Sequence, residues 1–233
     1  MPLRTLIPIA LFLPAAWSAS VAVAQDGALE PFSMTTSAIT VDAEVAQETH
    51  FLGRHAVVIE GGAPWLVYDL VSLAWSDRIS EIEVSAERCR QWAQDSAKKT
   101  RASAAKPENA SVAAFALSLL DPDFDVTMDG DELVLSNEFL DYRVIPAGGM
   151  TPARRLAVYA YGRIDACYTA MTRGSLPPFP ELALVDELES REIVPARIVF
   201  TVDGGGQHRT RTLTYTYSDL PAEDAARLTE MVD

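Results

Sequence analysis

The order in which strand and helix patterns follow one another constrains the fold more than any other feature of this sequence. Alternating apolar residues predict strands up to Val84, helix-forming residues occupy Ser85 to Leu120, and strands return from Phe124 to Ile145. Two more helices are expected between Thr151 and Glu192, before a last pair of strands that ends at Ser218. A parallel sheet needs strands and helices in regular alternation. The grouped order therefore predicts an α+β fold with a mainly antiparallel sheet.

Local signals place several of these elements. Ser85 is a candidate N-cap for a helix that extends to Lys106 without glycine or proline. Thr151-Pro152 is typical of a helix start, because proline fits the first helical position. Asp129-Gly130 lies between two strand patterns and predicts a tight hairpin. The alternation of apolar and polar residues from Ile39 to Ala46 predicts a single strand there.

The segment from Met1 to Ala24 has the pattern of a secretory signal peptide. Arg4 precedes an apolar run, and Ala22-Val23-Ala24 has the small residues that a signal peptidase reads. A transmembrane helix is the alternative, but the apolar run is interrupted by proline and falls short of about 20 residues. We expect residues 1–24 to be removed, leaving residues 25–233 as a single domain that is periplasmic or otherwise secreted and has no transmembrane anchor.

Export changes how the two cysteines are interpreted. In an oxidising compartment, a pair of cysteines usually forms a disulfide. A bond between Cys89 and Cys167 would join the helix that begins at Ser85 to the helix that begins at Pro152. Two separate buried thiols are the alternative.

Charge excludes one class of partner and suggests another. The formal net charge of −14 argues against a nucleic-acid partner, since such proteins neutralise phosphates with basic residues. Basic residues nevertheless gather on the two helices that carry the cysteines, and five of them are candidates for electrostatic docking: Lys98, Lys99, Arg101, Arg154 and Arg155. Joined helices would present a basic side to an anionic lipid headgroup or an acidic protein partner. Two solvated helix faces are the alternative.

No motif for catalysis, metal binding or a cofactor stands out. The spacing of acidic residues from Asp121 to Glu132 is like that of a calcium loop, but Val126 stands where that loop needs glycine, so an acidic hairpin is the competing interpretation. The histidines are scattered and no nucleophile motif is present. We expect no catalytic residues, no metal and no cofactor. A hydrolase assembled from His50, His55 and Asp69 is the remaining enzymatic alternative.

Two stretches resemble a known family. Val57 to Asp69, followed by Trp75, resembles the paired strands of the periplasmic outer-membrane lipoprotein carriers (LolA-like proteins), and Phe124 to Leu135 is similar to the later hairpin of that family. The resemblance implies an open antiparallel half-barrel with helices packed in or over its concave face, and an apolar cavity that shields acyl chains. The segment from Thr151 to Arg191 and the cysteine pair are additions to the family pattern.

The function expected from this resemblance is that of an exported, non-enzymatic, monomeric carrier. A lipid or a lipoprotein acyl chain would occupy the cavity. Aromatic residues on or beside the predicted elements are candidates for its wall: Trp65, Tyr68, Trp75, Phe139, Tyr142 and Tyr159. A protein-interaction module, with the concave face filled by its own side chains, is the alternative.

Overall fold

The computed structural model describes residues 29–39, 44–60, 63–78, 82–105, 110–172, 177–204 and 206–232. The expected signal peptide, residues 1–24, therefore lies outside the described residues.

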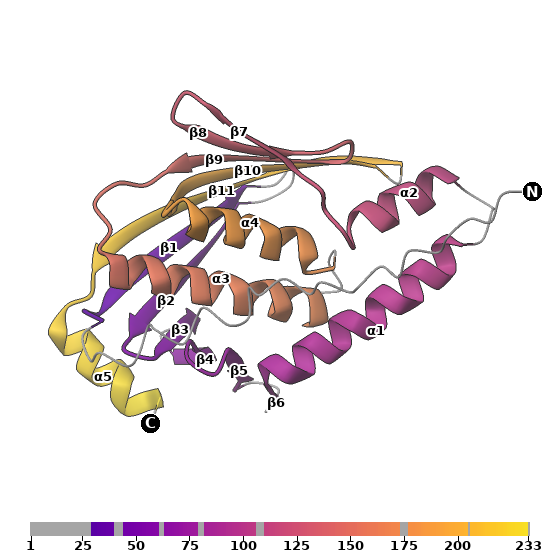
Figure 1. The fold of residues 1–233 in the computed structure, drawn as a ribbon. Coiled ribbons are helices and arrows are strands. Elements are labelled where there is room, and N and C mark those ends of the chain that lie inside the picture. The colour runs from indigo at the N-terminus through magenta and orange to yellow at the C-terminus, as the bar shows by residue number, and fades with distance from the viewer. Residues whose placement is uncertain are drawn as a thin grey trace, which may run out of the picture.

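All described strands belong to one open antiparallel sheet of 11 strands, ordered β6-β5-β4-β3-β2-β1-β11-β10-β9-β8-β7. Figure 1 shows the sheet curving around helices α3 and α4, so that both lie on its concave face. The fold class predicted from the order of elements is confirmed. The strands are β1 (Phe32–Ile39), β2 (Glu44–Leu52), β3 (His55–Glu60), β4 (Ala63–Asp69), β5 (Ala74–Asp77), β6 (Ile82–Val84), β7 (Asp125–Asp129), β8 (Glu132–Ser136), β9 (Leu140–Pro146), β10 (Pro195–Gly204) and β11 (Gln207–Asp219).

Strands from the two ends of the chain meet in the middle of the sheet. β1 pairs with β11 over its full length, from Phe32 opposite Asp219 to Ile39 opposite Thr212. Each half of the sheet then extends outward through neighbours in sequence, from β1 to β6 on one side and from β11 back to β7 on the other. The central pairing makes the two halves one continuous concave surface.

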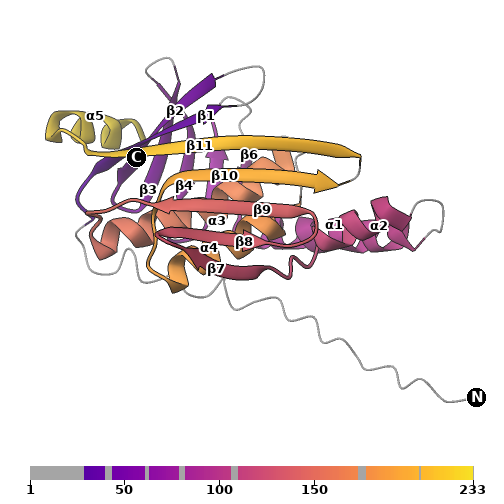
Figure 2. The same cartoon turned by 90° about the horizontal axis from the view of Figure 1, so that it is seen from above.

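Five helices complete the described fold: α1 (Ala86–Ala104), α2 (Ala110–Ser118), α3 (Pro152–Thr172), α4 (Phe179–Ser190) and α5 (Ala222–Val232). The hydroxyl of Ser85 accepts a hydrogen bond from the Arg88 N–H at 3.3 Å, and that of Thr151 accepts one from the Arg154 N–H at 3.3 Å. Both predicted helix starts are thus confirmed. Figures 1 and 2 show α1 and α2 extending beyond one end of the sheet. None of the described helices is long and apolar enough to cross a membrane.

The predicted strand from Ile39 to Ala46 is wrong. Ile39 ends β1 and Glu44 begins β2, and these two residues face each other across an antiparallel pair. The alternation in this stretch therefore spans the end of one strand and the start of the next. Periodicity records the alternation of residue types and not the direction of the chain, so it could not show that two strands are involved.

Apolar side chains form two clusters on opposite faces of the sheet. The larger one lies between the concave face and helices α3 and α4. The smaller one joins α5 to the convex face through Leu52, Val57, Val67, Ala225 and Leu228. Helix α5 thus covers part of the convex face. Successive residues Ala56, Val57 and Val58 of β3 are therefore buried on both sides of the sheet, which explains the uninterrupted apolar run there.

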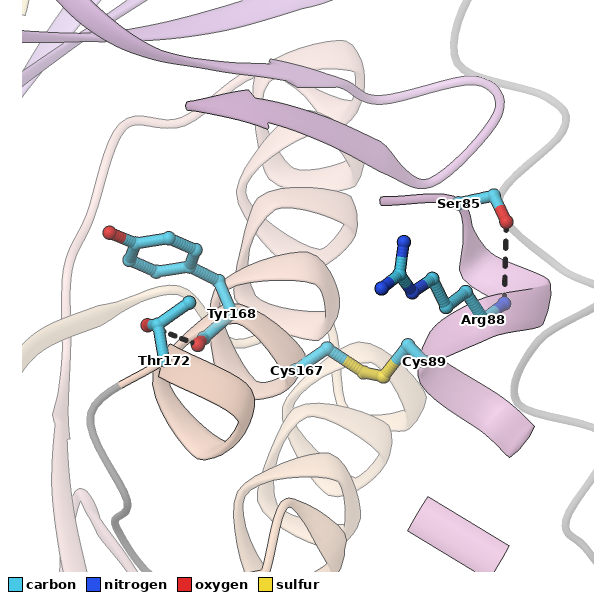
Figure 3. The surroundings of a disulfide bond; sticks show 6 residues. All are labelled: Ser85, Arg88, Cys89, Cys167, Tyr168 and Thr172. Carbon is cyan, nitrogen blue, oxygen red and sulfur yellow. Dashed lines mark hydrogen bonds between the residues drawn. A yellow bond between two sulfur atoms is a disulfide. The ribbon is translucent and has the colours of Figure 1, made fainter. Parts of the chain in front are cut away.

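The predicted disulfide is present between Cys89 and Cys167 (Figure 3), with the two Cα atoms 6.1 Å apart and 78 positions between the residues in sequence. Both cysteines are fully buried. The bond attaches the first turn of α1 to the C-terminal half of α3, and so joins the projecting helices to the helix that covers the sheet.

Candidate functional site

A cavity of about 340 Å³ lies between the α3–α4 pair and the concave face of the sheet. Aliphatic side chains from both sides contribute to its wall, including Met34 and Leu66 from the sheet and Val158, Leu184 and Leu188 from the helices. These residues are buried, so the wall is fixed by packing within the main core. The site is therefore a hollow that reaches into the core and is partly open to solvent, where exposed Val45 joins its lining.

Helix α3 forms one wall because of its residue spacing. Tyr161, Asp165 and Tyr168 are separated by four and three positions, so they share one face of the helix, and all three line the cavity. The Tyr68 hydroxyl, from β4, donates a hydrogen bond to Asp165 at 2.8 Å. Gly162 lets α4 approach closely, because a Cβ atom there would lie 3.0 Å from Cγ2 of Val185.

Tyrosine is the prominent aromatic residue of the cavity. Six tyrosines line it: Tyr68, Tyr142, Tyr159, Tyr161, Tyr168 and Tyr215. Burial raises the pKa of Tyr68, Tyr142 and Tyr161 well above the ordinary value, and raises that of Tyr159 to about 12. These hydroxyls therefore remain protonated and neutral around pH 7.

Three charged side chains face the same space: Asp165 from α3, Glu181 from α4 and Arg211 from β11. Glu181 lines the cavity from the first turn of α4 and is exposed to water. Burial, and secondarily the negative charge of Asp165, raises the pKa of Glu181 to about 7, against an opposing effect of Arg211. This carboxyl therefore changes charge near neutral pH.

Two cavity tyrosines have hydroxyls without hydrogen-bond partners. The side-chain oxygens of Tyr142 and Tyr159 are buried and have no partner among the described residues. Only 3% of each residue is exposed. A buried hydroxyl without a partner carries a desolvation cost, which a polar ligand atom or a water molecule would relieve.

The six aromatic residues proposed for the cavity wall fall into two groups. Tyr68, Tyr142 and Tyr159 line the cavity. Trp65 and Trp75 contact the ring of Tyr168, and Phe139 packs against Phe115 of α2, so these three are not among the described lining residues. Aromatic residues suit both a packed core and a cavity wall, so residue type alone did not separate the two groups.

Sequence reasoning did not single out Asp165, Glu181, Arg211, Tyr161, Tyr168 or Tyr215. A usable signal existed on α3, where Asp165 interrupts an otherwise apolar face at helical spacing from Tyr161. A charged residue on an apolar stripe indicates a buried polar contact or a site. Glu181 and Arg211 carried no comparable signal, since their meeting depends on how α4 lies across the sheet.

The five basic residues proposed for docking do not gather in one place. Arg154 is 2.7 Å from Asp219 and Arg155 is 2.7 Å from Glu192, at the N-terminal end of α3. Lys98, Lys99 and Arg101 are exposed on the C-terminal half of α1. The disulfide is near the opposite end of α3 from Arg154, about 20 Å away at 1.5 Å per residue. The bond therefore joins the two helices without joining the two basic groups.

A second, smaller cavity of about 260 Å³ lies on the convex face beneath α5. Glu48, His50, Asp224 and Arg227 are among its lining residues. The Ser33 hydroxyl lies 3.0 Å from Nδ1 of His50, its direct partner across β1 and β2. Burial lowers the pKa of His50. Ser33 is buried and is not among the described lining residues, so this contact is a cross-strand pair rather than an accessible nucleophile and base.

His55 and Asp69, the other two residues of the hydrolase alternative, face each other across β3 and β4. The Asp69 carboxylate forms an ion pair with Arg54, and accepts hydrogen bonds from the N–H groups of Val71 and Ser72 at 2.9 and 3.1 Å. Hydrogen bonds to the ionised carboxylate lower its pKa despite partial burial, which alone would raise it. Asp69 thus fixes the turn after β4.

The acidic segment that resembles a calcium loop forms the hairpin of β7 and β8, in which Asp129 faces Glu132. Gly130 has a φ of 63°, a left-handed conformation that suits the glycine of the predicted Asp-Gly turn. Within the part of the chain that the structure describes, no group of three His, Cys, Asp or Glu side chains is arranged to hold a metal ion.

Comparison with known proteins leaves the family open: neither the protein-family models nor the curated proteins contain a match to this chain.

Proposed function

We propose that this protein is an exported, monomeric carrier that holds the alkyl chain of a lipid or lipoprotein in the cavity beneath α3 and α4. The observation that supports the proposal is the cavity itself. A hollow of about 340 Å³ with a largely aliphatic and aromatic wall is preserved inside an otherwise packed core. Ligand sites typically measure about 300 to 1,000 Å³ and have such walls.

The energetics of alkyl-chain binding suit this wall. Transfer of each methylene from water into an apolar site is favourable by about 0.8 kcal/mol, so an alkyl chain binds without covalent chemistry. The polar side chains that line the cavity, Asp165, Glu181 and Arg211, would contact the headgroup at the end of such a chain. The resemblance of two hairpins to lipoprotein carriers supports the same function.

A protein-interaction module is the second candidate, and helix α2 favours it. None of its residues is buried, and Val112 and Leu117 are 44% and 42% exposed. An apolar helix that buries so little of its surface within its own fold is suited to contact with a partner. The two candidates differ in whether the cavity takes up an apolar ligand.

Uptake of N-phenyl-1-naphthylamine, an uncharged apolar dye, tests the carrier proposal. We expect saturable fluorescence enhancement with the unmodified protein, and its loss in Ala38→Trp, because Ala38 lines the cavity. Ala46→Trp is the matched control. Ala46 is exposed on the same sheet, between two residues that face the cavity, so its side chain points to the other face.

Circular dichroism would show that both variants are folded. Native mass spectrometry of protein purified from the periplasm would reveal co-purifying lipid. Absence of dye uptake by the unmodified protein, or equal uptake by the two variants, would contradict the proposal.

A further inference from the structure

The charges inside the cavity are unevenly balanced. Two carboxyl groups, Asp165 and Glu181, share the space with one guanidinium group, that of Arg211. They come from three different elements, so their meeting is a property of the fold and not of one acidic segment. A carboxylate in an apolar cavity loses hydration, and a cationic partner offsets that loss.

The tyrosines provide a second, independent indication of a polar ligand group. The buried hydroxyls of Tyr142 and Tyr159 have no hydrogen-bond partner among the described residues, and both residues line the cavity. Their neutral hydroxyls can accept hydrogen bonds as well as donate them. Burial, and secondarily the charge of Glu181, raises the pKa of Tyr142, so a ligand with N–H donors beside Glu181 would also lie near this hydroxyl.

The aromatic rings favour a cation over an anion. The ring of Tyr68 packs edge to face against the rings of Tyr161 and Tyr168, and all three residues line the cavity. Ring faces attract cations within about 6 Å of the centroid. A cavity wall that combines two carboxyl groups with tyrosine rings therefore suits an ammonium group better than a carboxylate or a phosphate.

We propose that the ligand is a cationic amphiphile, whose alkyl chain occupies the aliphatic part of the cavity and whose ammonium group lies between Glu181 and Asp165. This inference rests on the proposed carrier function and adds the chemistry of the headgroup. When the site is empty, the positive charge of Arg211 reduces the repulsion between the two carboxylates. Arg211 is exposed, so water screens its repulsion of a bound ammonium group.

The charge of Glu181 makes the proposed recognition dependent on pH. The charged groups that act on this carboxyl are Asp165 from α3 and Arg211 from β11. The charge of Glu181 in turn adds to the effect of burial in raising the pKa values of Tyr142 on β9 and Tyr215 on β11. Its pKa of about 7 means that it is mostly protonated at pH 5.5 and mostly ionised at pH 8.5. An alkylammonium group keeps its charge over this range, like the ammonium of lysine with its pKa near 10.4. Affinity for the amine should therefore rise with pH.

Isothermal titration calorimetry with three ligands of equal chain length tests the proposal. Dodecylammonium, dodecanol and dodecanoate would be titrated below their micellar concentrations at pH 5.5 and pH 8.5. We expect dodecylammonium to bind most tightly at pH 8.5. Its affinity should fall about tenfold at pH 5.5, because protonation of Glu181 removes one ion pair, which is weak in a partly hydrated site.

Glu181→Gln should remove most of this pH dependence, and Asp165→Asn should weaken amine binding at both pH values. Glu187→Gln is the matched control, because Glu187 lies on the same helix and pairs with Arg191 outside the cavity. Equal affinities for the three ligands, tightest binding of dodecanoate, or an unchanged pH dependence in Glu181→Gln would overturn the headgroup assignment while leaving the carrier function standing. Failure of all three ligands to bind would overturn the carrier function itself.

Discussion

The two faces of helix α3 use polar residues in opposite ways. Arg163 and Cys167, four positions apart, share the face that is attached to neighbouring helices. Tyr161 and Asp165, also four positions apart, share the face that lines the cavity. The first face contacts α1 and α4 through the disulfide and the ion pairs of Arg163, whereas the second face lines the cavity, where Asp165 accepts a hydrogen bond from Tyr68. The comparison separates residues that hold the helix in place from residues that are available to a ligand.

The attached face holds its one buried cation between two acids. Only 3% of Arg163 is exposed, and its guanidinium lies 2.8 Å from Asp186 and also pairs with Glu189, both on α4. Burial raises the pKa of Asp186 although the Arg163 contact lowers it. The cavity also has two acids to one base, but its base, Arg211, is exposed whereas Arg163 is buried.

Removal of the disulfide is expected to have the largest effect on stability. The loop closed by Cys89 and Cys167 spans 78 positions, and the lost constraint on the unfolded chain corresponds to about 4.5 kcal/mol. We expect the free energy of unfolding of Cys89→Ala/Cys167→Ala, measured in urea, to fall by about this amount. Dye uptake by the folded fraction should persist, because neither cysteine lines the cavity. Loss of dye uptake in a folded variant would show that the cavity face of α3 depends on the attachment of the other face.

Arg163→Met is expected to cost about 3 kcal/mol, because it leaves two partly buried carboxylates without their cation. Arg143→Met is the matched control. Arg143 also contacts two acids, Glu132 and Asp141, but its side chain is 46% exposed, so its loss should cost less than about 1 kcal/mol. Equal losses in the two variants would show that burial does not distinguish the attached face.

On the cavity side, the unfolding free energy should decline as pH rises from 4.5 to 7. The pKa of Glu181 is raised on folding from 4.5 to about 7, so the folded state holds this proton more firmly. Stability from this group is present below pH 4.5 and is lost as pH rises through 7. Relative to Glu181→Gln, the unfolding free energy should fall by about 1 kcal/mol. This is less than the full pKa difference would give, because water in the cavity screens the charge. Parallel pH profiles for the two proteins would contradict the raised pKa.

The smallest effect is expected at His50, which belongs to neither face of α3. Burial lowers its pKa below 6.5, so its contribution to stability is present above pH 6.5 and is lost as pH falls. The difference in unfolding free energy between the unmodified protein and His50→Gln should therefore shrink from pH 7.5 to pH 5. A difference that grows on acidification would mean that Glu48 and Asp224 outweigh burial.

Local sequence signals were sufficient for the elements but not for the site. Ser85 and Thr151 marked helix starts, and Asp129-Gly130 marked a hairpin, because each signal acts through the backbone of its own neighbours. The disulfide followed from composition and the expected compartment. In contrast, Glu181 and Arg211 lie on elements that meet only when α4 crosses the sheet.

The aromatic candidates show the same limit more narrowly. Tyr68 faces the cavity, whereas its partner across the strands, Trp75 on β5, contacts the ring of Tyr168 and is not among the described lining residues. Alternation along a strand assigns a face, but it does not say where on that face a cavity begins. That boundary depends on curvature and on the position of α3, which no single segment encodes.

A crystal structure of the protein grown with dodecylammonium would test the central claim most directly. The account predicts an alkyl chain between α3, α4 and the concave face, with its nitrogen within hydrogen-bond distance of the Glu181 carboxylate. A cavity that holds only water or rearranged side chains, with the amphiphile bound elsewhere or absent, would contradict it.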